Sequence, residues 1–185
     1  MRPHENSEVS IRVVVVNASG FICEGLSRVI ERFKGIDAVA SLQHPQDLGD
    51  VAQQLRADVA LIDAQFPSQA GFEAARRLGE SGAKTTRVLI LSVNPSLAEV
   101  ERVLQSGAHG FLLREAGVCE LETALHAAVR GEKFLCPTIL QRLPEGLTID
   151  AMTRGDSLPA GAAQARYSIE DILSKALKLG ILQQK

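Results

Sequence analysis

The chain of 185 residues is poor in the side chains on which small extracellular and metal-binding proteins depend. It has no tryptophan, 4% aromatic residues and 3 cysteines, which are Cys23, Cys119 and Cys136. The cysteines are odd in number, far apart and outside any CxxC spacing. This pattern argues against a disulfide framework and a zinc site, and it predicts reduced, mostly buried thiols.

A strong charge and a long apolar run are also missing. The formal net charge is −2, which argues against strong non-specific binding of nucleic acid by the whole chain. Residues 1–10 are polar and no stretch is long enough to span a bilayer, so we expect a soluble, cytoplasmic protein without membrane contact. The sequence offers no nucleophile–base pair, metal cluster or Gly-rich phosphate loop, which argues against an enzyme.

What the chain does contain is a regular alternation of two patterns. Short apolar runs predict strands at residues 11–16, 36–42, 58–63, 87–93 and 109–114. Apolar positions at helical spacing predict helices at residues 21–33, 45–55, 72–78, 95–105 and 118–129. Alternation of this kind predicts an α/β fold, a doubly wound five-stranded parallel sheet with helices on both faces.

The two ends of the chain differ from this middle part. Residues 1–10 are expected to form a flexible tail, and residues 11–137 the α/β domain. Residues 138–185 are broken by proline and glycine before a helical pattern begins at Ser168. Their basic side chains outnumber the acidic ones by only one, which is poor for DNA binding. This extension is either a packing or dimerising helix or a degenerate, shortened DNA-binding unit.

Polar residues stand where several predicted strands end. Asn17 and Ala18 follow the first strand, Asp63 ends the third, Ser92 belongs to the fourth and Arg114 to the fifth. Each alone reads as a cap or a solvated charge. Because parallel strands end at one edge of a sheet, together they predict a small polar site there.

Residues 11–137 resemble the receiver domain of two-component response regulators, of the NarL/LuxR-type subfamily. The resemblance is carried by the segment 63–67 (Asp-Ala-Gln-Phe-Pro) with Gly71, and by the segments 107–114 and 131–137. It implies that Asp63 occupies the phosphoacceptor position and Ser92 the switch-hydroxyl position. It also implies that Phe111 occupies the aromatic switch position and Arg114 the position of the family's lysine.

Two departures from the family matter for function. Asn17 and Ala18 stand where the family has two acidic residues that bind Mg²⁺, so we expect Mg²⁺ binding to be weak or absent and no other cofactor. Arg114 could then pair directly with Asp63, even in a bidentate manner, and hold the site in one state without phosphate. The alternative is a pocket that binds a small ligand.

These features predict an atypical, phosphorylation-independent response regulator that signals through protein–protein contacts. The expected partners are a second copy of the chain, in a homodimer, and a regulatory protein. The alternative is a LuxR-type DNA-binding transcription regulator with a degenerate receiver, although the charge of residues 138–185 does not favour DNA as a partner.

Overall fold

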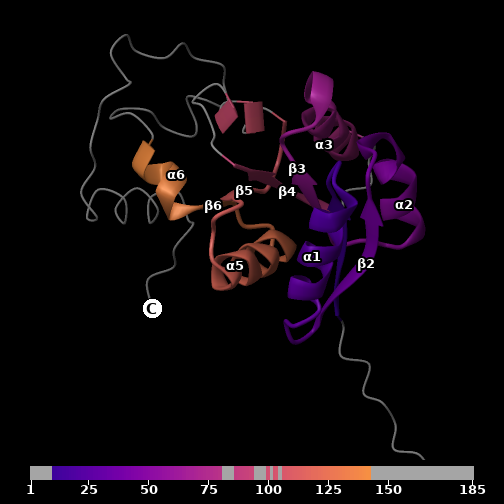
Figure 1. Cartoon of the computed structure of the whole chain (residues 1–185), viewed down its shortest axis with the longest axis horizontal. Coiled ribbons are helices and arrows are strands. Elements are labelled where there is room, and N and C mark those ends of the chain that lie inside the picture. Colours follow the sequence, from indigo (N-terminus) through magenta and orange to yellow (C-terminus); the bar gives the residue numbers. More distant parts are fainter. Residues whose placement is uncertain (1–9, 81–85, 94–98, 101, 104–105, 143–185) are drawn as a thin grey trace, which may run out of the picture.

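The computed structural model describes residues 10–80, 86–93, 99–100, 102–103 and 106–142 (Figure 1). Six parallel strands form one sheet in the order β2-β1-β3-β4-β5-β6. The strands are β1 (Ile11–Val16), β2 (Ile36–Leu42), β3 (Val59–Asp63), β4 (Arg87–Ser92), β5 (Gly110–Leu113) and β6 (Phe134–Leu135). The sequence prediction of a doubly wound parallel sheet is confirmed.

The count of five strands was one short, because β6 was not predicted. Phe134 and Leu135 pair with Gly110 and Phe111 of β5. The backbone N–H of Phe134 donates to the carbonyl of His109 at 2.9 Å. Two residues carry no readable alternation, so β6 depends on the unpaired edge of β5 and not on its own sequence pattern.

The helices follow the strands as expected, with shifted ends. They are α1 (Gly20–Ile30), η1 (Pro45–Asp47), α2 (Leu48–Gln54), η2 (Pro67–Gln69), α3 (Ala70–Glu80), α5 (Val118–Val129) and α6 (Pro137–Arg142). Helix α3 extends two residues beyond the predicted end at residue 78 and includes Gly79. The helix predicted at 95–105 lies partly, and the one predicted from Ser168 wholly, outside the described residues. No helix in the described part is long and apolar enough to cross a membrane.

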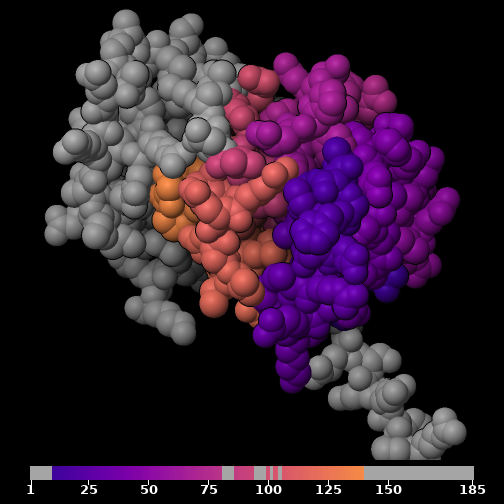
Figure 2. Space-filling model, in the orientation of Figure 1, coloured from indigo at the N-terminus to yellow at the C-terminus, as the bar shows by residue number. Residues whose placement is uncertain are grey.

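Alternate side chains of the strands point to opposite faces of the sheet. In β1, Val13 and Val15 pack with α1 and α5, whereas Val14 and Val16 pack with α2 and α3. Helices α1 and α5 therefore lie on one face (Figure 1), and Figure 2 shows them side by side as indigo and salmon surfaces. The period of two that defines a strand thus divides the core into two layers.

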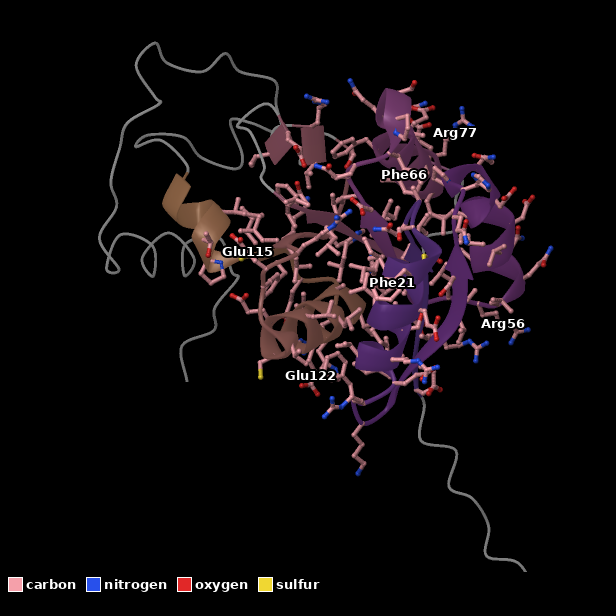
Figure 3. The ribbon with its side chains drawn as sticks, in the orientation of Figure 1. Phe21, Arg56, Phe66, Arg77, Glu115 and Glu122 are labelled. Carbon is pink, nitrogen blue, oxygen red and sulfur yellow. The ribbon has the colours of Figure 1, made fainter. Side chains whose placement is uncertain are left out.

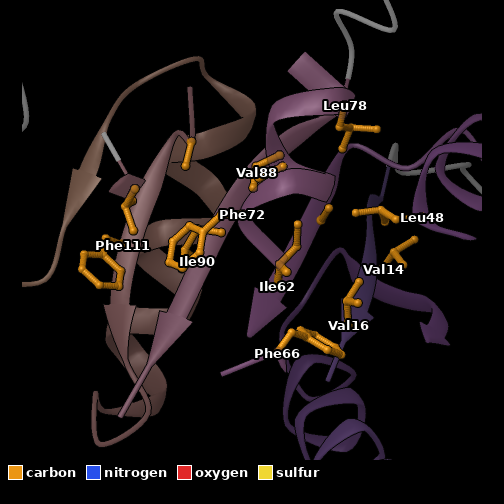
Figure 4. Close-up of a cluster of buried hydrophobic side chains, with 14 of the residues drawn as sticks. Val14, Val16, Leu48, Ile62, Phe66, Phe72, Leu78, Val88, Ile90 and Phe111 are labelled. Atoms are coloured by element: carbon orange, nitrogen blue, oxygen red, sulfur yellow. The ribbon is translucent and has the colours of Figure 1, made fainter. Parts of the chain in front are cut away.

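The layer under α2 and α3 also receives residues from the end of the domain (Figure 4). Phe111 of β5 is fully buried there, and so is Ile139 of α6. Burying one such side chain stabilises the fold by roughly 1.5–3 kcal/mol. The first turn of the C-terminal extension, as the sequence analysis bounded it, thus packs into the core of the α/β domain.

Candidate functional site

The polar residues at the strand ends lie on one edge of the sheet. Asn17 follows β1, Asp63 ends β3, Ser92 ends β4 and Arg114 follows β5, and these four strands are consecutive neighbours. Open α/β sheets place their sites at this carboxyl edge. The structure brings Asn17 and Arg114 into contact with Asp63.

Asp63 is the centre of this network and is almost wholly buried, with 4% of its side chain exposed. Its Oδ1 accepts the backbone N–H of Gln65 at 2.8 Å. Its Oδ2 accepts hydrogen bonds from Nδ2 of Asn17 and Nη2 of Arg114. A buried carboxylate requires such partners, since a buried charge left alone costs several kcal/mol. Three protein donors, one of them a cation, thus stabilise the charge of Asp63.

Asn17 is held at both ends of its amide. Its Oδ1 accepts the backbone N–H of Ser19 at 2.8 Å, which leaves Nδ2 to donate to Asp63. The hydrogen-bond network assigns this orientation, because a flipped amide would face Ser19 with a second donor. The carbonyl of Asn17 accepts the thiol of Cys23 at 3.3 Å, and burial raises the pKa of that thiol. Asn17 thus presents a neutral donor to Asp63.

Arg114 supplies the positive charge of the site from its rim, with 29% of its side chain exposed. Only Nη2 reaches Asp63, and the buried Nε has no hydrogen-bond partner. The expected pairing with Asp63 is present, but it is a single contact and not bidentate. Oδ1 of Asp63 accepts the backbone N–H of Gln65, and the guanidinium approaches Oδ2 alone.

Ser92 and Phe111 are both fully buried. Ser92 joins the network only through its backbone carbonyl, which accepts the N–H of Arg114 at 2.7 Å. Its hydroxyl makes no hydrogen bond. Phe111, without a phenol oxygen, packs in the core. Ala18 is exposed and brings no polar side-chain atom to the edge.

Gly71 has a role that sequence reasoning did not identify. A Cβ at this position would lie 2.6 Å from the carbonyl oxygen of Asp63, so α3 approaches β3 more closely than any side chain allows. Ser68 and Gln69, just before it, have φ values of 54° and 60°, which are uncommon for residues other than glycine. The resemblance included Gly71, but only the structure shows why glycine is required there.

The site does not fit the Mg²⁺ ion that the family resemblance implies. Mg²⁺ needs oxygen ligands, usually one or two carboxylates with waters. Asp63 is the only carboxylate of the network, Asn17 faces it with its amide nitrogen, and Arg114 puts a cation beside it. No group of three acidic, histidine or cysteine side chains among the described residues could hold a metal ion.

Comparisons with known proteins agree with this fold. The model of the response regulator receiver domain matches residues 13–126. The chain is 29% identical over 133 residues to the response regulator GacA of Pseudomonas aeruginosa, a match that covers 72% of this chain and 62% of GacA. The chain thus spans less than two thirds of the length of this relative.

Solved structures give the same result. A two-component response regulator of the LuxR family from Aurantimonas sp. SI85-9A1 is 25% identical, with a TM-score of 0.66 over 71% of this chain and 94% of that chain. The signal receiver domain of the response regulator NarL from Mycobacterium tuberculosis is 28% identical, with a TM-score of 0.62 over 66% of this chain and 98% of that chain. The chain therefore belongs to the response regulator receiver domain family.

Proposed function

We propose that this response regulator acts without phosphorylation of Asp63 and signals through protein–protein contacts. The observation that carries the proposal is the double occupation of Asp63 Oδ2 by Asn17 and Arg114. A phosphoryl group would have to displace both donors from a carboxylate that is 4% exposed. The residues present also lack the acidic ligands with which Mg²⁺ neutralises charge during phosphoryl transfer.

The positions of two surface pockets favour a site at Asp63 that is held in one state over a site that binds a small ligand. A pocket of about 320 Å³ is lined by residues of η1, α2 and α3, and one of about 340 Å³ by η2, α3 and residues 102 and 106. Neither is lined by Asp63, Asn17 or Arg114.

Exposed apolar side chains support a protein partner at this edge. Phe21 is 87% exposed, Val93 45% and Val118 54%, and they follow the ends of β1, β4 and β5. Phe21 is labelled beside α1 in Figure 3. Apolar groups gathered around one edge are typical of an interaction surface. We propose that a regulatory protein with an apolar face binds here and that the chain itself is a homodimer.

The test of phosphorylation independence is exposure of the full chain to acetyl phosphate with Mg²⁺, followed by intact mass measurement. We expect no adduct on the natural protein. The matched control is the triple variant Asn17→Asp, Ala18→Asp, Arg114→Lys, which restores the family's residues and should gain one phosphoryl group. A stoichiometric adduct on Asp63 of the natural protein would overturn the proposal.

A second candidate function is that of a LuxR-type DNA-binding transcription regulator. It is favoured by the similarity to the LuxR-family regulator from Aurantimonas, at 25% identity. A gel-shift assay with promoter DNA at moderate salt distinguishes the two candidates. Specific retardation would support the second, whereas no retardation, with a homodimer in sedimentation velocity, would support the first.

A further inference from the structure

The face of the sheet opposite to α1 and α5 carries a groove that the proposed function does not use. It lies between α2 and α3, which are neighbours in Figure 1, and it has a volume of about 320 Å³. Its floor consists of buried or half-buried apolar residues, which are Pro45, Leu48, Ala70, Ala74 and Leu78. An apolar floor between two helices is typical of a surface that receives the apolar face of another helix.

Small residues on both walls keep this α2–α3 groove open. Gly49 of α2 is exposed, and a Cβ at this position would meet nothing within 4 Å. Across the groove, α3 presents the short side chains of Ala70 and Ala74. The distance at which two helices pack depends on the side chains between them, so these walls allow a third helix to approach closely.

The two walls of the groove differ in charge. On the α2 side, Asp47 and Asp50 are exposed, and neither makes an ion pair with a described residue. On the α3 side, Arg77 is 70% exposed and pairs with Glu73 at 2.9 Å. The complementary helix therefore has a basic side chain towards α2 and an acidic one towards α3.

The C-terminal extension of the chain contains a helical pattern with these properties. Its apolar residues recur at helical spacing and are Ile169, Ile172, Leu173, Ala176 and Leu177. At 3.6 residues per turn, Glu170 falls on one flank of this apolar face and Lys175 on the other. An apolar face of this kind needs cover from another surface.

Residues 143–167 join this segment to α6 and are enough to bring it to the groove. About 25 residues cover roughly 80 Å when fully extended, whereas a domain of about 130 residues has a radius of gyration of about 14 Å. Because the segment belongs to the same chain, its effective concentration at the groove is on the order of millimolar. Contacts too weak to hold a separate partner are therefore sufficient to hold this segment.

We propose that the segment 169–177 docks as a helix in the α2–α3 groove of its own chain. Its apolar face covers the apolar floor of the groove, and Lys175 lies towards Asp47 and Asp50. The docked segment keeps other proteins from this face of the domain. The carboxyl edge stays open to the partner of the proposed function, so the two contacts are independent.

The experiment is NMR of the full chain with a nitroxide attached through Ser174→Cys, on the polar side of the segment. Cys119→Ser removes the exposed thiol, whereas Cys23 and Cys136 are buried. The loss of amide signal caused by the nitroxide reports which residues lie near the segment.

We expect a strong loss of signal at Gly49 and Ala74, which line the groove. Gly25 of α1 lies on the other face of the sheet and should keep its signal. Equal loss at Gly49 and Gly25, or no loss at either, would overturn the proposal.

Two further variants test the fit of the segment. Leu173→Lys puts a charge on the apolar face of the segment and should restore the signals of Gly49 and Ala74. Gly49→Leu fills the groove from a position with open space around its Cβ and should restore the signal of Ala74. The matched control is Gly25→Leu, since Gly25 is also exposed with nothing within 4 Å of a Cβ, and it should change nothing. An equal response to both glycine variants would contradict docking in this groove.

A mixed sample distinguishes the chain's own segment from that of a second copy. It combines isotope-labelled chain without the nitroxide and unlabelled chain that carries it. We expect the signal of Gly49 to be unchanged in this mixture. Loss of the Gly49 signal would mean that a second copy occupies the groove, and the proposal would be overturned.

Discussion

The charged side chains at the two edges of the sheet differ in the partners that they have. At the carboxyl edge, Asp63 is buried and each of its oxygens has a protein donor. At the amino edge, where the strands begin, Nη1 of Arg87 is hydrogen-bonded to Nε2 of His109 at 3.0 Å, and among the described residues no carboxylate forms an ion pair with Arg87. The same parallel strands run from one edge to the other, so the difference in charge comes from the side chains and not from the backbone. It follows that an ion pair balances the charge at the first edge, whereas none of the described ion pairs does so at the second.

We expect the largest loss of stability when Arg114 is removed from the carboxyl edge. Arg114→Ala leaves a buried carboxylate with only neutral donors, and we expect a loss of about 2–3 kcal/mol, between the costs of exposed and buried pairs. Asp63→Ala leaves a guanidinium that is 29% exposed and can be hydrated, so about 1–2 kcal/mol should be lost.

Urea unfolding of the two single variants and the double variant measures the coupling. Because the residues share one interaction, the double variant should lose less than the sum of the single losses. Full additivity would show that the pair does not exist in solution. The fixed-state account of the site would then have to be abandoned.

Gly71→Ala tests how tightly the carboxyl edge is packed. A methyl group 2.6 Å from the carbonyl of Asp63 forces α3 away from β3, at a cost of about 1–3 kcal/mol. Gly49→Ala, in α2 with nothing near its Cβ, is the matched control and should gain roughly 0.5–1 kcal/mol. Thermal melting of both variants measures the contrast, and equal losses would contradict the close approach.

The amino edge predicts a dependence of stability on pH. The pKa of His109 is lowered to about 4 in the folded chain, whereas an ordinary histidine of the unfolded chain titrates near 6.5. The unfolded state therefore binds more protons in this window, and stability falls as pH drops from about 6.5 towards 4.

The loss between about pH 7 and about pH 5 should be about 1 kcal/mol after allowance for solvent screening. Urea unfolding of the natural protein and of His109→Gln at both pH values isolates the contribution of this ring. Parallel pH profiles for the two proteins would mean that His109 is not held neutral.

The smallest effect concerns the pair of Arg130 and Glu132 at the surface. Arg130→Gln breaks this solvent-screened pair and should leave the melting temperature unchanged. Thermal melting checks this, and a clear drop in melting temperature would show that the pair contributes more than surface pairs usually do.

Sequence reasoning could predict the fold because its strands are long apolar runs, such as the valines of residues 13–16. The meeting of Asp63 with Arg114 also followed from the rule that parallel strands end together. The role of Asn17 was harder to predict. The resemblance shows that an acidic residue is missing there, but not that the amide donates a hydrogen bond to Asp63. Nothing in the sequence singled out His109, because its contacts are made with the backbone N–H of Val88 and the guanidinium of Arg87, which both belong to β4.

The amide of Asn17, held by Ser19 on one side and by Asp63 on the other, bears on how such a site can evolve. Restoring an acid at position 17 alone would place two carboxylates together in a buried space and remove a donor from Asp63. Restoring lysine at position 114 alone would not bring back a metal ligand. The change at position 17 alone is therefore unfavourable, and the change at position 114 alone does not supply a metal ligand.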